Sequence, residues 1–545
     1  MSNKEPVVWE CYKLHCTPAA DVWRELLEKS LDDQSCPYNY DIRGFSIRIW
    51  ERNATIIKVP NSTITGRDGF IIERVAFDRQ INSTLVGIGV ARLYFEADSM
   101  HPTYKSTKEL FEKGKYPPKL EHLRLIVGNQ RLVEYFNSIT DVKLVPHVNY
   151  TVVEQADKIH YHFENTSFSL ARVCFNPGLS KNLLDAVRSK TAIVPSALCL
   201  GVFCIGYGKE LNIIQRVSNE VVKVLNDWNC KVSLSELYTP DDVEQFINPS
   251  NVQPIVLFPL EGKKGDRPQD CFLQWIKYFS ENKIGFQLFS TSSKPSYNRH
   301  GIAISILSKA NGCAFTVVPD AIPNFQNSWF IGMDIGKGGQ QKGKVLVFTL
   351  TSFTGGLKAY YRIQKNEDDT ISSDALFEGL KWIISKAEEF SPYREIFIIH
   401  DGLRPKYELL ENYTNALGDK KFTLIEYAKS GTPLIHCEHH QPTAATTLLI
   451  ENSEFTAIYP CMSSKPKELI SPVKFRVPIN PNRYSSEDIA QLLTALCHSA
   501  TLSYQPSRLP APIYWADGIG GLSNANLQFA GWSHLPNRLV DLRKQ

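Results

Sequence analysis

The sequence predicts an α/β protein of three regions, because the order of expected strands and helices changes twice along its 545 residues. Residues 1–190 favour strands, residues 191–325 alternate strands with helices, and residues 326–545 open with consecutive strands before a helix. A chain of this length commonly holds roughly two to four domains. We therefore place the expected domain boundaries at these two changes of pattern.

The composition is that of an ordinary folded protein. Apolar residues make up 43% and charged residues 21% of the chain, which excludes general disorder. The net charge of +3 excludes a uniformly basic nucleic-acid coat but leaves room for a local basic channel. None of the 12 cysteines forms a CxxC pair, so we expect reduced, mostly buried thiols and a cytoplasmic protein.

Neither a signal peptide nor a membrane span is predicted. The opening segment "MSNKEPVVWECYKLHC" lacks a basic stretch followed by an apolar core. The most membrane-like stretch, Thr191 to Gly208, is interrupted by Pro195 and is short for a span of about 20 residues. It is better explained as strands of a buried sheet, and we expect no membrane partner.

The first region is predicted to be β-rich, with short strands and few long helices. Runs such as "TLVGIGVARLYFEA" are apolar and rich in β-branched and aromatic residues. "FNPGLSKN" then breaks the pattern before the second region. There, the strands "ALCLGVFCIG", "QPIVLFPL" and "IGFQLFS" alternate with apolar patterns at helical spacing, which predicts a Rossmann-like parallel sheet.

The third region predicts the opening of a ribonuclease H-like fold. "WFIGMDIG", "KVLVFTLTSF" and "GLKAYYRIQ" read as three antiparallel strands joined by tight turns. "SDALFEGLKWIISKAEEF" is an amphipathic helix with Ser373 or Asp374 as its expected N-cap, and "REIFIIHDG" is the next strand.

A glycine-rich loop in the third region resembles a nucleotide-binding P-loop only in spacing. Gly338 to Lys344, "GGQQKGK", is followed by Val345, where a P-loop needs Ser or Thr for magnesium. A strand follows as well, whereas phosphate binding requires a helix N-terminus. We interpret the segment as a hairpin turn whose lysines are candidate contacts for a nucleic-acid backbone.

Three aspartates are the candidate catalytic residues. Asp334 and Asp401 each end a predicted strand, and these strands lie side by side in the expected fold. Asp517 follows a third apolar run, "LPAPIYWAD". Clustered carboxylates repel one another unless cations join them, and they suit Mg²⁺ and Mn²⁺, which support two-metal phosphodiester hydrolysis. Asp-Gly pairs also occur in ordinary turns, which is the alternative explanation at Asp401 and Asp517.

The segments "FIGMDIG", "IFIIHDGLRP" and "LPAPIYWADG" resemble the PIWI domain of prokaryotic Argonaute proteins. Active members of that family use an Asp-Glu-Asp-Asp or Asp-Glu-Asp-His tetrad. The resemblance implies that Asp334, Asp401 and Asp517 bind Mg²⁺ or Mn²⁺. It also implies a catalytic glutamate on the loop "QKNEDDTISSDAL", for which Glu367 is the candidate and Asp369 the alternative.

"FLQWIKYFSENKIGFQLF" resembles the Argonaute MID motif that binds the 5′ end of a guide strand. The resemblance implies that Leu273, Lys277, Gln287 and Lys309 line this site. Lysines and a helix N-terminus suit a terminal phosphate, although the same lysines fit the surface of amphipathic helices. Leu273 stands where an aromatic residue often stacks on the first base, which implies a 5′-hydroxyl guide or a weaker base preference.

The resemblance implies the following organisation and function. Residues 1–190 would form an N-terminal and linker-like region with the PAZ domain missing or reduced, 191–325 a MID domain and 326–545 a PIWI domain. The protein would be a guide-directed endonuclease whose partners are a single-stranded guide and a complementary target, each DNA or RNA. The alternative is a catalytically weak or inactive sensor that recruits an accessory effector protein.

Two further candidate features of the sequence contain histidine. "HCEHH", His436 to His440, is either an exposed loop or a structural zinc site, and five adjacent residues cannot all face one ion in a strand. His400 precedes Asp401 in the same strand, so its side chain is expected on the opposite face and packed in the core.

Overall fold

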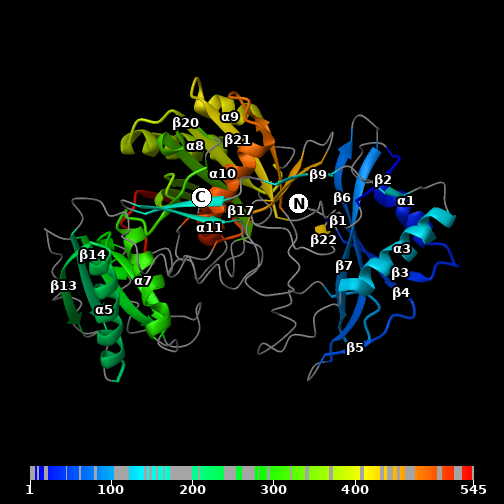
Figure 1. Ribbon diagram of the computed structural model, residues 1–545, viewed down its shortest axis with the longest axis horizontal. Helices are drawn as coiled ribbons and strands as arrows, with labels where there is room; N and C mark the ends of the chain where they lie inside the picture. Colours follow the sequence, from blue (N-terminus) through cyan, green and yellow to red (C-terminus); the bar gives the residue numbers. More distant parts are fainter. Residues whose placement is uncertain are drawn as a thin grey trace.

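The computed structural model shows a chain built around one large central sheet, with a smaller sheet toward each end (Figure 1). It describes all residues except 1–5, 9–10, 17–21, 44–45, 60–62, 79–82, 104–121, 140–143, 147–149, 155–157, 164–165, 172–198, 206–208, 239–252, 261–276, 280, 291–294, 320–321, 338–342, 367–371, 405–409, 430–434, 438–445, 451–454, 461–472, 500–505, 521–530 and 543–545.

The N-terminal region forms a seven-stranded antiparallel sheet with two helices. Its strands are β2 (Cys11–Leu14), β3 (Tyr38–Arg43), β4 (Ser46–Glu51), β5 (Ile57–Lys58), β6 (Thr65–Asp78), β7 (Ser83–Phe95) and β8 (Leu144–Pro146). The helices α1 (Val22–Leu31) and α3 (His122–Ile139) pack against it through a shared apolar core.

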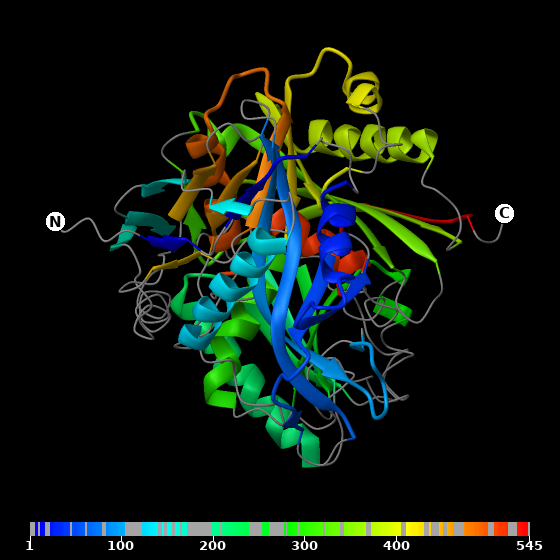
Figure 2. The same cartoon turned by 90° about the vertical axis from the view of Figure 1, so that its right-hand side faces the viewer.

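The prediction of short strands and few long helices is wrong for part of this region. Strands β6 and β7 have 14 and 13 residues and pair along their whole length, and α3 has 18 residues. A register shift between Arg74 and Ala76 adds a bulge that lets the long hairpin twist. Figure 2 shows this blue ribbon running through most of the height of the molecule.

The middle region is a four-stranded parallel sheet of order β13-β12-β14-β15, which confirms the predicted alternation of strand and helix. Its elements are β12 (Cys199–Ile205), α5 (Lys209–Asp227), β13 (Lys231–Tyr238), β14 (Gln253–Leu260), β15 (Gly285–Ser290) and α7 (Pro295–Lys309). Strand β12 is buried, as expected for this apolar run. In the described residues, no helix is both long and apolar enough to cross a membrane.

The C-terminal region is organised around a ten-stranded sheet of order β26-β19-β18-β17-β20-β21-β25-β24-β23-β9. Its strands are β17 (Ser328–Lys337), β18 (Lys344–Thr351), β19 (Leu357–Lys365), β20 (Glu395–Asp401), β21 (Phe422–Ala428), β23 (Thr446–Ile450), β24 (Thr456–Tyr459), β25 (Val473–Ile479), β26 (Asn537–Asp541) and β9 (Tyr150–Glu154). As predicted, β17, β18 and β19 are antiparallel and β20 lies parallel beside β17.

Helices cover both faces of this sheet. They are α8 (Ser373–Phe390) and α9 (Leu410–Leu417) on one face, and α10 (Ser486–His498) and α11 (Ala511–Gly520) on the other. The N-cap of α8 is Ser372, whose side chain accepts a hydrogen bond from Ala375 N, so the predicted caps Ser373 and Asp374 are wrong by one or two positions. Those two residues instead form the first turn of the helix.

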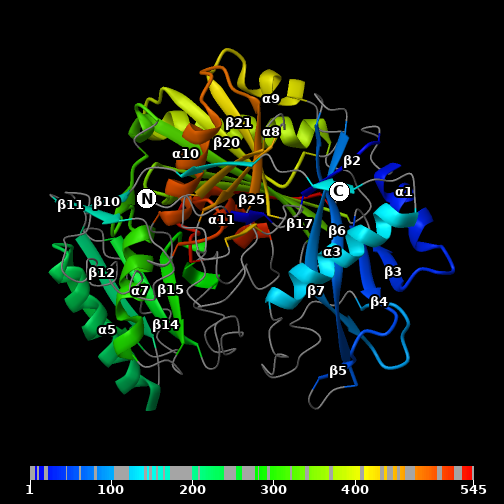
Figure 3. The same cartoon turned by 45° about the vertical axis from the view of Figure 1, so that its right-hand side comes forward.

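Strands from distant parts of the chain connect the three regions. β9, from the first 190 residues, pairs with β23 at the edge of the ten-stranded sheet. Two small sheets add further links: β1 (Pro6–Val8) pairs with β22 (Ile435–Cys437), and β10 (Lys158–Phe163) lies between β11 (Thr166–Ala171) and β16 (Thr316–Val317). Figure 3 shows the N-terminal region on the right and the middle region on the lower left, on opposite sides of the molecule. The predicted boundaries at 190 and 325 stay predictions.

Candidate metal centre

Asp334 and Asp401 are brought together by the pairing of β17 with β20. The parallel register joins Met333 to His400, so the two aspartates are the next residues across this pair. Because side chains alternate between the faces of a strand, Asp334 lies on the same face as Gly332, and Asp401 on the same face as Ile399. That face of the sheet is covered by α10 and α11.

Asp517 reaches the other two aspartates from α11, because this helix packs against β17 and β18. A Cβ atom on Gly332 would lie 2.2 Å from Pro512 O, so only glycine allows this approach. Thr349 Oγ1 donates a hydrogen bond of 2.8 Å to Pro512 O, and Trp515 Nε1 donates one of 2.9 Å to Gly355 O. The third apolar run is therefore a buried helix, which tolerates Pro512 because it lies in the first turn.

The three aspartates form one cluster, with a carboxylate oxygen of each within 4.8 Å of the others. Asp334 is buried, with a relative exposure of 9%, whereas Asp517 is exposed. Burial, followed by the negative charges of Asp401 and Asp517, raises the pKa of Asp334 to about 6. Burial also raises the pKa of Asp401, although a hydrogen bond from Lys429 partly offsets that effect. Like charges held this close favour the binding of a cation.

The donor set fits the metal ions that the sequence predicts. All three ligands are carboxylates, the hard oxygen donors that Mg²⁺ and Mn²⁺ prefer, and the cluster contains no thiolate or imidazole. The residues that would hold such ions are Asp334, Asp401 and Asp517. Glu367 and its alternative Asp369 lie outside the described residues, so the fourth acid stays a prediction.

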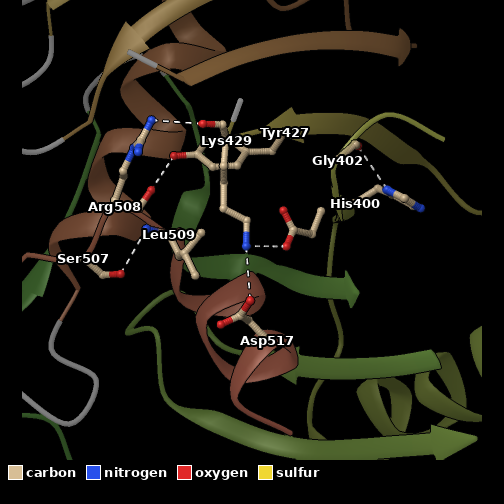
Figure 4. Close-up of polar contacts among 9 residues, drawn as sticks. His400, Gly402, Tyr427, Lys429, Ser507, Arg508, Leu509 and Asp517 are labelled. Carbon is tan, nitrogen blue, oxygen red and sulfur yellow. Dashed lines mark hydrogen bonds and ion pairs between the residues drawn. The ribbon is translucent and has the colours of Figure 1, made fainter. Parts of the chain in front are cut away.

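Lys429 is a residue of this site that the sequence analysis missed. Its Nζ lies 2.7 Å from Asp401 Oδ2 and 3.1 Å from Asp517 Oδ1, and Figure 4 shows the side chain extended toward Asp517. Burial lowers the pKa of Lys429, but the hydrogen bonds and charges of the two aspartates outweigh burial and raise it overall. The available signal was its position directly after β21, the parallel neighbour of β20.

The predicted guide-binding residues are only partly brought together. Lys309 Nζ donates hydrogen bonds to Phe286 O and, over 2.9 Å, to Gln287 Oε1. Lys309 is buried, and this burial lowers its pKa to about 7. The side chain of Lys277 is 77% exposed, and its Nζ lies 3.9 Å from Glu281 Oε1, as expected for a lysine on a helix surface. Leu273 lies outside the described residues.

The C-terminal segment also contributes to the surroundings of Lys309, which the sequence analysis did not predict. The Trp532 ring centroid lies 5.4 Å from Lys309 Nζ, and His534 Nε2 donates a hydrogen bond of 2.8 Å to Lys309 O. Gly531 O accepts a hydrogen bond from Phe286 N. The end of α7, the start of β15 and residues 531–534 therefore form one packed unit.

The remaining sequence predictions concern His400, the glycine-rich loop and the histidine cluster. His400 is buried on the face opposite Asp401, and its Nδ1 donates to Gly402 O over 3.1 Å, which confirms the expected packing (Figure 4). The strands on either side of the glycine-rich loop pair from Lys337 to Lys344, as in a hairpin. His436 and Cys437 lie in strand β22 and pair with β1, so the expected exposed loop is wrong for these two residues. Residues 338–342 and 438–440 lie outside the described residues, so the zinc-site alternative stays a prediction.

The chain resembles known proteins in structure but not in sequence. No protein-family model and no curated protein sequence matches the chain. Among solved structures, Marinitoga piezophila Argonaute in complex with a 5′-OH guide RNA has 14% identity and a TM-score of 0.63, covering 94% of this chain and 86% of that one.

Two further structures agree with this match. Drosophila Piwi has 10% identity and a TM-score of 0.63, with 95% of this chain and 87% of that one covered. Clostridium butyricum Argonaute, bound to a guide DNA and a 19-mer target DNA, has 14% identity and a TM-score of 0.61 over the same shares. The chain therefore has the α/β fold of Argonaute and Piwi proteins, with a ribonuclease H-like sheet that carries Asp334 and Asp401.

Proposed function

We propose that this protein is a guide-directed endonuclease that binds a short single-stranded guide and cleaves the complementary strand. The observation that carries the proposal is the cluster of Asp334, Asp401 and Asp517, three residues far apart in the sequence whose carboxylates come within 4.8 Å. Burial and mutual repulsion make this cluster unfavourable in itself, since they raise the pKa of Asp334 to about 6. A site of this kind is expected to persist for a function.

The three aspartates would supply ligands that are held in fixed positions and that differ in their exposure to solvent. Asp334 and Asp401 are fixed by paired strands, and Asp517 is fixed by the close contact of α11 with β17. Divalent ions bound there would activate water and stabilise the leaving oxygen of a phosphodiester. Asp334 is buried and Asp517 is exposed, so the site opens to solvent at Asp517 on α11. A nucleic-acid strand could reach the site from that side.

The proposed nucleic-acid partners are supported by the structural neighbours and by the middle region. The neighbours include an Argonaute with guide RNA and target DNA and another with guide DNA and target DNA. In this chain, Gln287 and Lys309 are two of the four residues predicted for the guide 5′ end, and their hydrogen bond holds an ammonium that would bind a terminal anion. Base pairing would then read the sequence while the protein holds the backbone.

A cleavage assay tests this function. A labelled strand complementary to the guide is incubated with DNA or RNA guides, carrying either a 5′-phosphate or a 5′-hydroxyl, in Mg²⁺ or Mn²⁺. We expect one cut at a fixed distance from the guide 5′ end, lost in Asp401→Asn and kept in the matched control Asp419→Asn, whose aspartate is exposed after α9. Tight guide binding without any cut would instead support the sensor that recruits an effector protein.

A further inference from the structure

We propose that Lys429 is a built-in counter-ion of the aspartate cluster, which a divalent cation must displace and which then binds a phosphate of the nucleic acid. This inference rests on the proposed function, because it assigns Lys429 a role in loading the same metal site. Its consequence is that the metal ion and the nucleic acid bind cooperatively. Lys429 would thus be a positioning residue that couples the two ligands.

The ammonium of Lys429 lies between two carboxylates of the cluster. Lys429 Nζ bridges Asp401 Oδ2 and Asp517 Oδ1, at 2.7 and 3.1 Å. These carboxylates are two of the three that the structure offers to a metal ion. A divalent cation held by the same oxygens would lie next to the ammonium. The metal ion and the ammonium would then repel each other strongly, because the site is partly buried. The metal ion and the ammonium therefore compete for these carboxylates.

The backbone of Lys429 is anchored, while its side chain is partly exposed and has room to move. Arg508 Nη2 donates a hydrogen bond of 3.1 Å to Lys429 O, and the buried Tyr427 donates one of 2.6 Å from its hydroxyl to Arg508 O (Figure 4). The side chain of Lys429 itself is 35% exposed. A flexible four-carbon stem on a fixed backbone can turn its ammonium away without leaving the site.

The net charge of the cluster changes sign when metal ions bind. The three carboxylates and one ammonium leave two negative charges in the cluster. Two divalent ions would reverse that balance, so the displaced ammonium would need an anion of its own. A phosphodiester lying across the site provides one. The metal ions release the ammonium to bind the phosphodiester, and the phosphodiester draws the ammonium away from the metal ligands. The two binding events therefore strengthen each other to the same extent.

The test measures Mn²⁺ binding by the electron paramagnetic resonance signal of free Mn²⁺, without relying on cleavage. The proteins are the wild type, Lys429→Met, Lys429→Arg and the control Lys420→Met, which removes an exposed ion pair with Glu388 elsewhere. Each is measured alone and with a guide paired to a phosphorothioate-protected target. Alone, Lys429→Met should bind Mn²⁺ about tenfold more tightly than the wild type, a typical size for such a coupling.

The duplex should tighten Mn²⁺ binding in the wild type and have a much smaller effect in Lys429→Met. Lys429→Arg keeps the cation and should bind Mn²⁺ weakly when alone, and Lys420→Met should match the wild type. Equal or weaker Mn²⁺ binding in Lys429→Met, alongside a wild type that binds Mn²⁺ and cleaves, would overturn the counter-ion role and leave the nuclease standing. No Mn²⁺ binding by any protein, with or without duplex, would overturn both.

Discussion

The aspartate cluster and the Lys309 site bury charge of opposite sign, and burial shifts the pKa of a residue at each site toward its neutral form. In the cluster, burial and like charges raise the pKa of Asp334 to about 6. At the other site, burial lowers the pKa of Lys309 to about 7, and its ammonium donates hydrogen bonds to Phe286 O and Gln287 Oε1. The comparison suggests that the first site requires a cation and the second an anion, as expected for a metal ion and a guide phosphate.

The largest expected effect comes from moving α11 without touching any acid. In Gly332→Ala, the new Cβ would lie 2.2 Å from Pro512 O, so the helix that carries Asp517 must shift. A displacement of about 1 Å can cost on the order of 100-fold in rate, and overpacking costs about 1–3 kcal/mol of stability. Guide binding should not change, because Lys309 lies elsewhere. Cleavage kinetics, denaturant unfolding and guide affinity measure the three effects.

The control for this substitution is Gly301→Ala. Gly301 lies in α7, where an added Cβ would meet no atom within 4 Å, so alanine should leave cleavage intact and raise stability slightly. Full cleavage by Gly332→Ala would contradict the role given to the contact between α11 and β17.

A smaller effect is expected at the Lys309 site, as a dependence of guide affinity on pH. A terminal phosphate favours the ammonium form of Lys309, and the charged fraction of a group with a pKa of about 7 falls about tenfold per unit above that pH. The affinity for a 5′-phosphate guide should therefore fall by about fivefold between pH 7 and pH 8 and by about tenfold over the next unit. Fluorescence anisotropy with labelled guides measures it.

A guide with a 5′-hydroxyl should show little of this dependence, and Lys309→Met should remove it. An affinity for the 5′-phosphate guide that stays constant from pH 6.5 to 8.5 would show that Lys309 does not bind the terminal phosphate.

The smallest expected effect is on stability, from Asp334→Asn. Neutralising a buried and repelled carboxylate should raise the free energy of unfolding of the metal-free protein by about 1 kcal/mol, while cleavage is lost. Because the folded-state pKa is raised, the gain is full above pH 6 and disappears as Asp334 takes up its proton below that value. Urea unfolding in a chelator measures it, with Asp419→Asn as an exposed control. A clear loss of stability in Asp334→Asn at pH 8 would contradict the strain assigned to this carboxylate.

The parts of the site that follow from strand order could be predicted from the sequence. Asp401 ends β20 as predicted, whereas β17 continues past Asp334 to Lys337, so the prediction that Asp334 ends its strand is wrong. The two aspartates still come together because their strands are parallel neighbours and Met333 pairs with His400. The approach of Asp517 could not be derived in the same way, since it depends on the contact between Gly332 and Pro512. Lys429 follows β21, the next parallel strand, at the same edge, but a single lysine after a strand does not by itself indicate a bridge between two carboxylates.

The other surprises also come from contacts between residues far apart in the sequence. The pairing of β9 with β23, and the packing of Trp532 and His534 around Lys309, leave no local pattern in either segment. Gln287 and Lys309 were singled out through the resemblance to the MID motif, and the structure brings these two together while Lys277 stays at the surface. Local periodicity predicts elements well, but tertiary packing decides which of their side chains meet.

The most direct test of the central claim is anomalous diffraction from crystals of the protein grown with Mn²⁺ and a guide–target duplex. The account predicts manganese peaks ligated by Asp334, Asp401 and Asp517, with the Lys429 ammonium moved away from the two aspartates that it now bridges. Crystals that contain the duplex but show no manganese at these three carboxylates, with Lys429 still between Asp401 and Asp517, would contradict it.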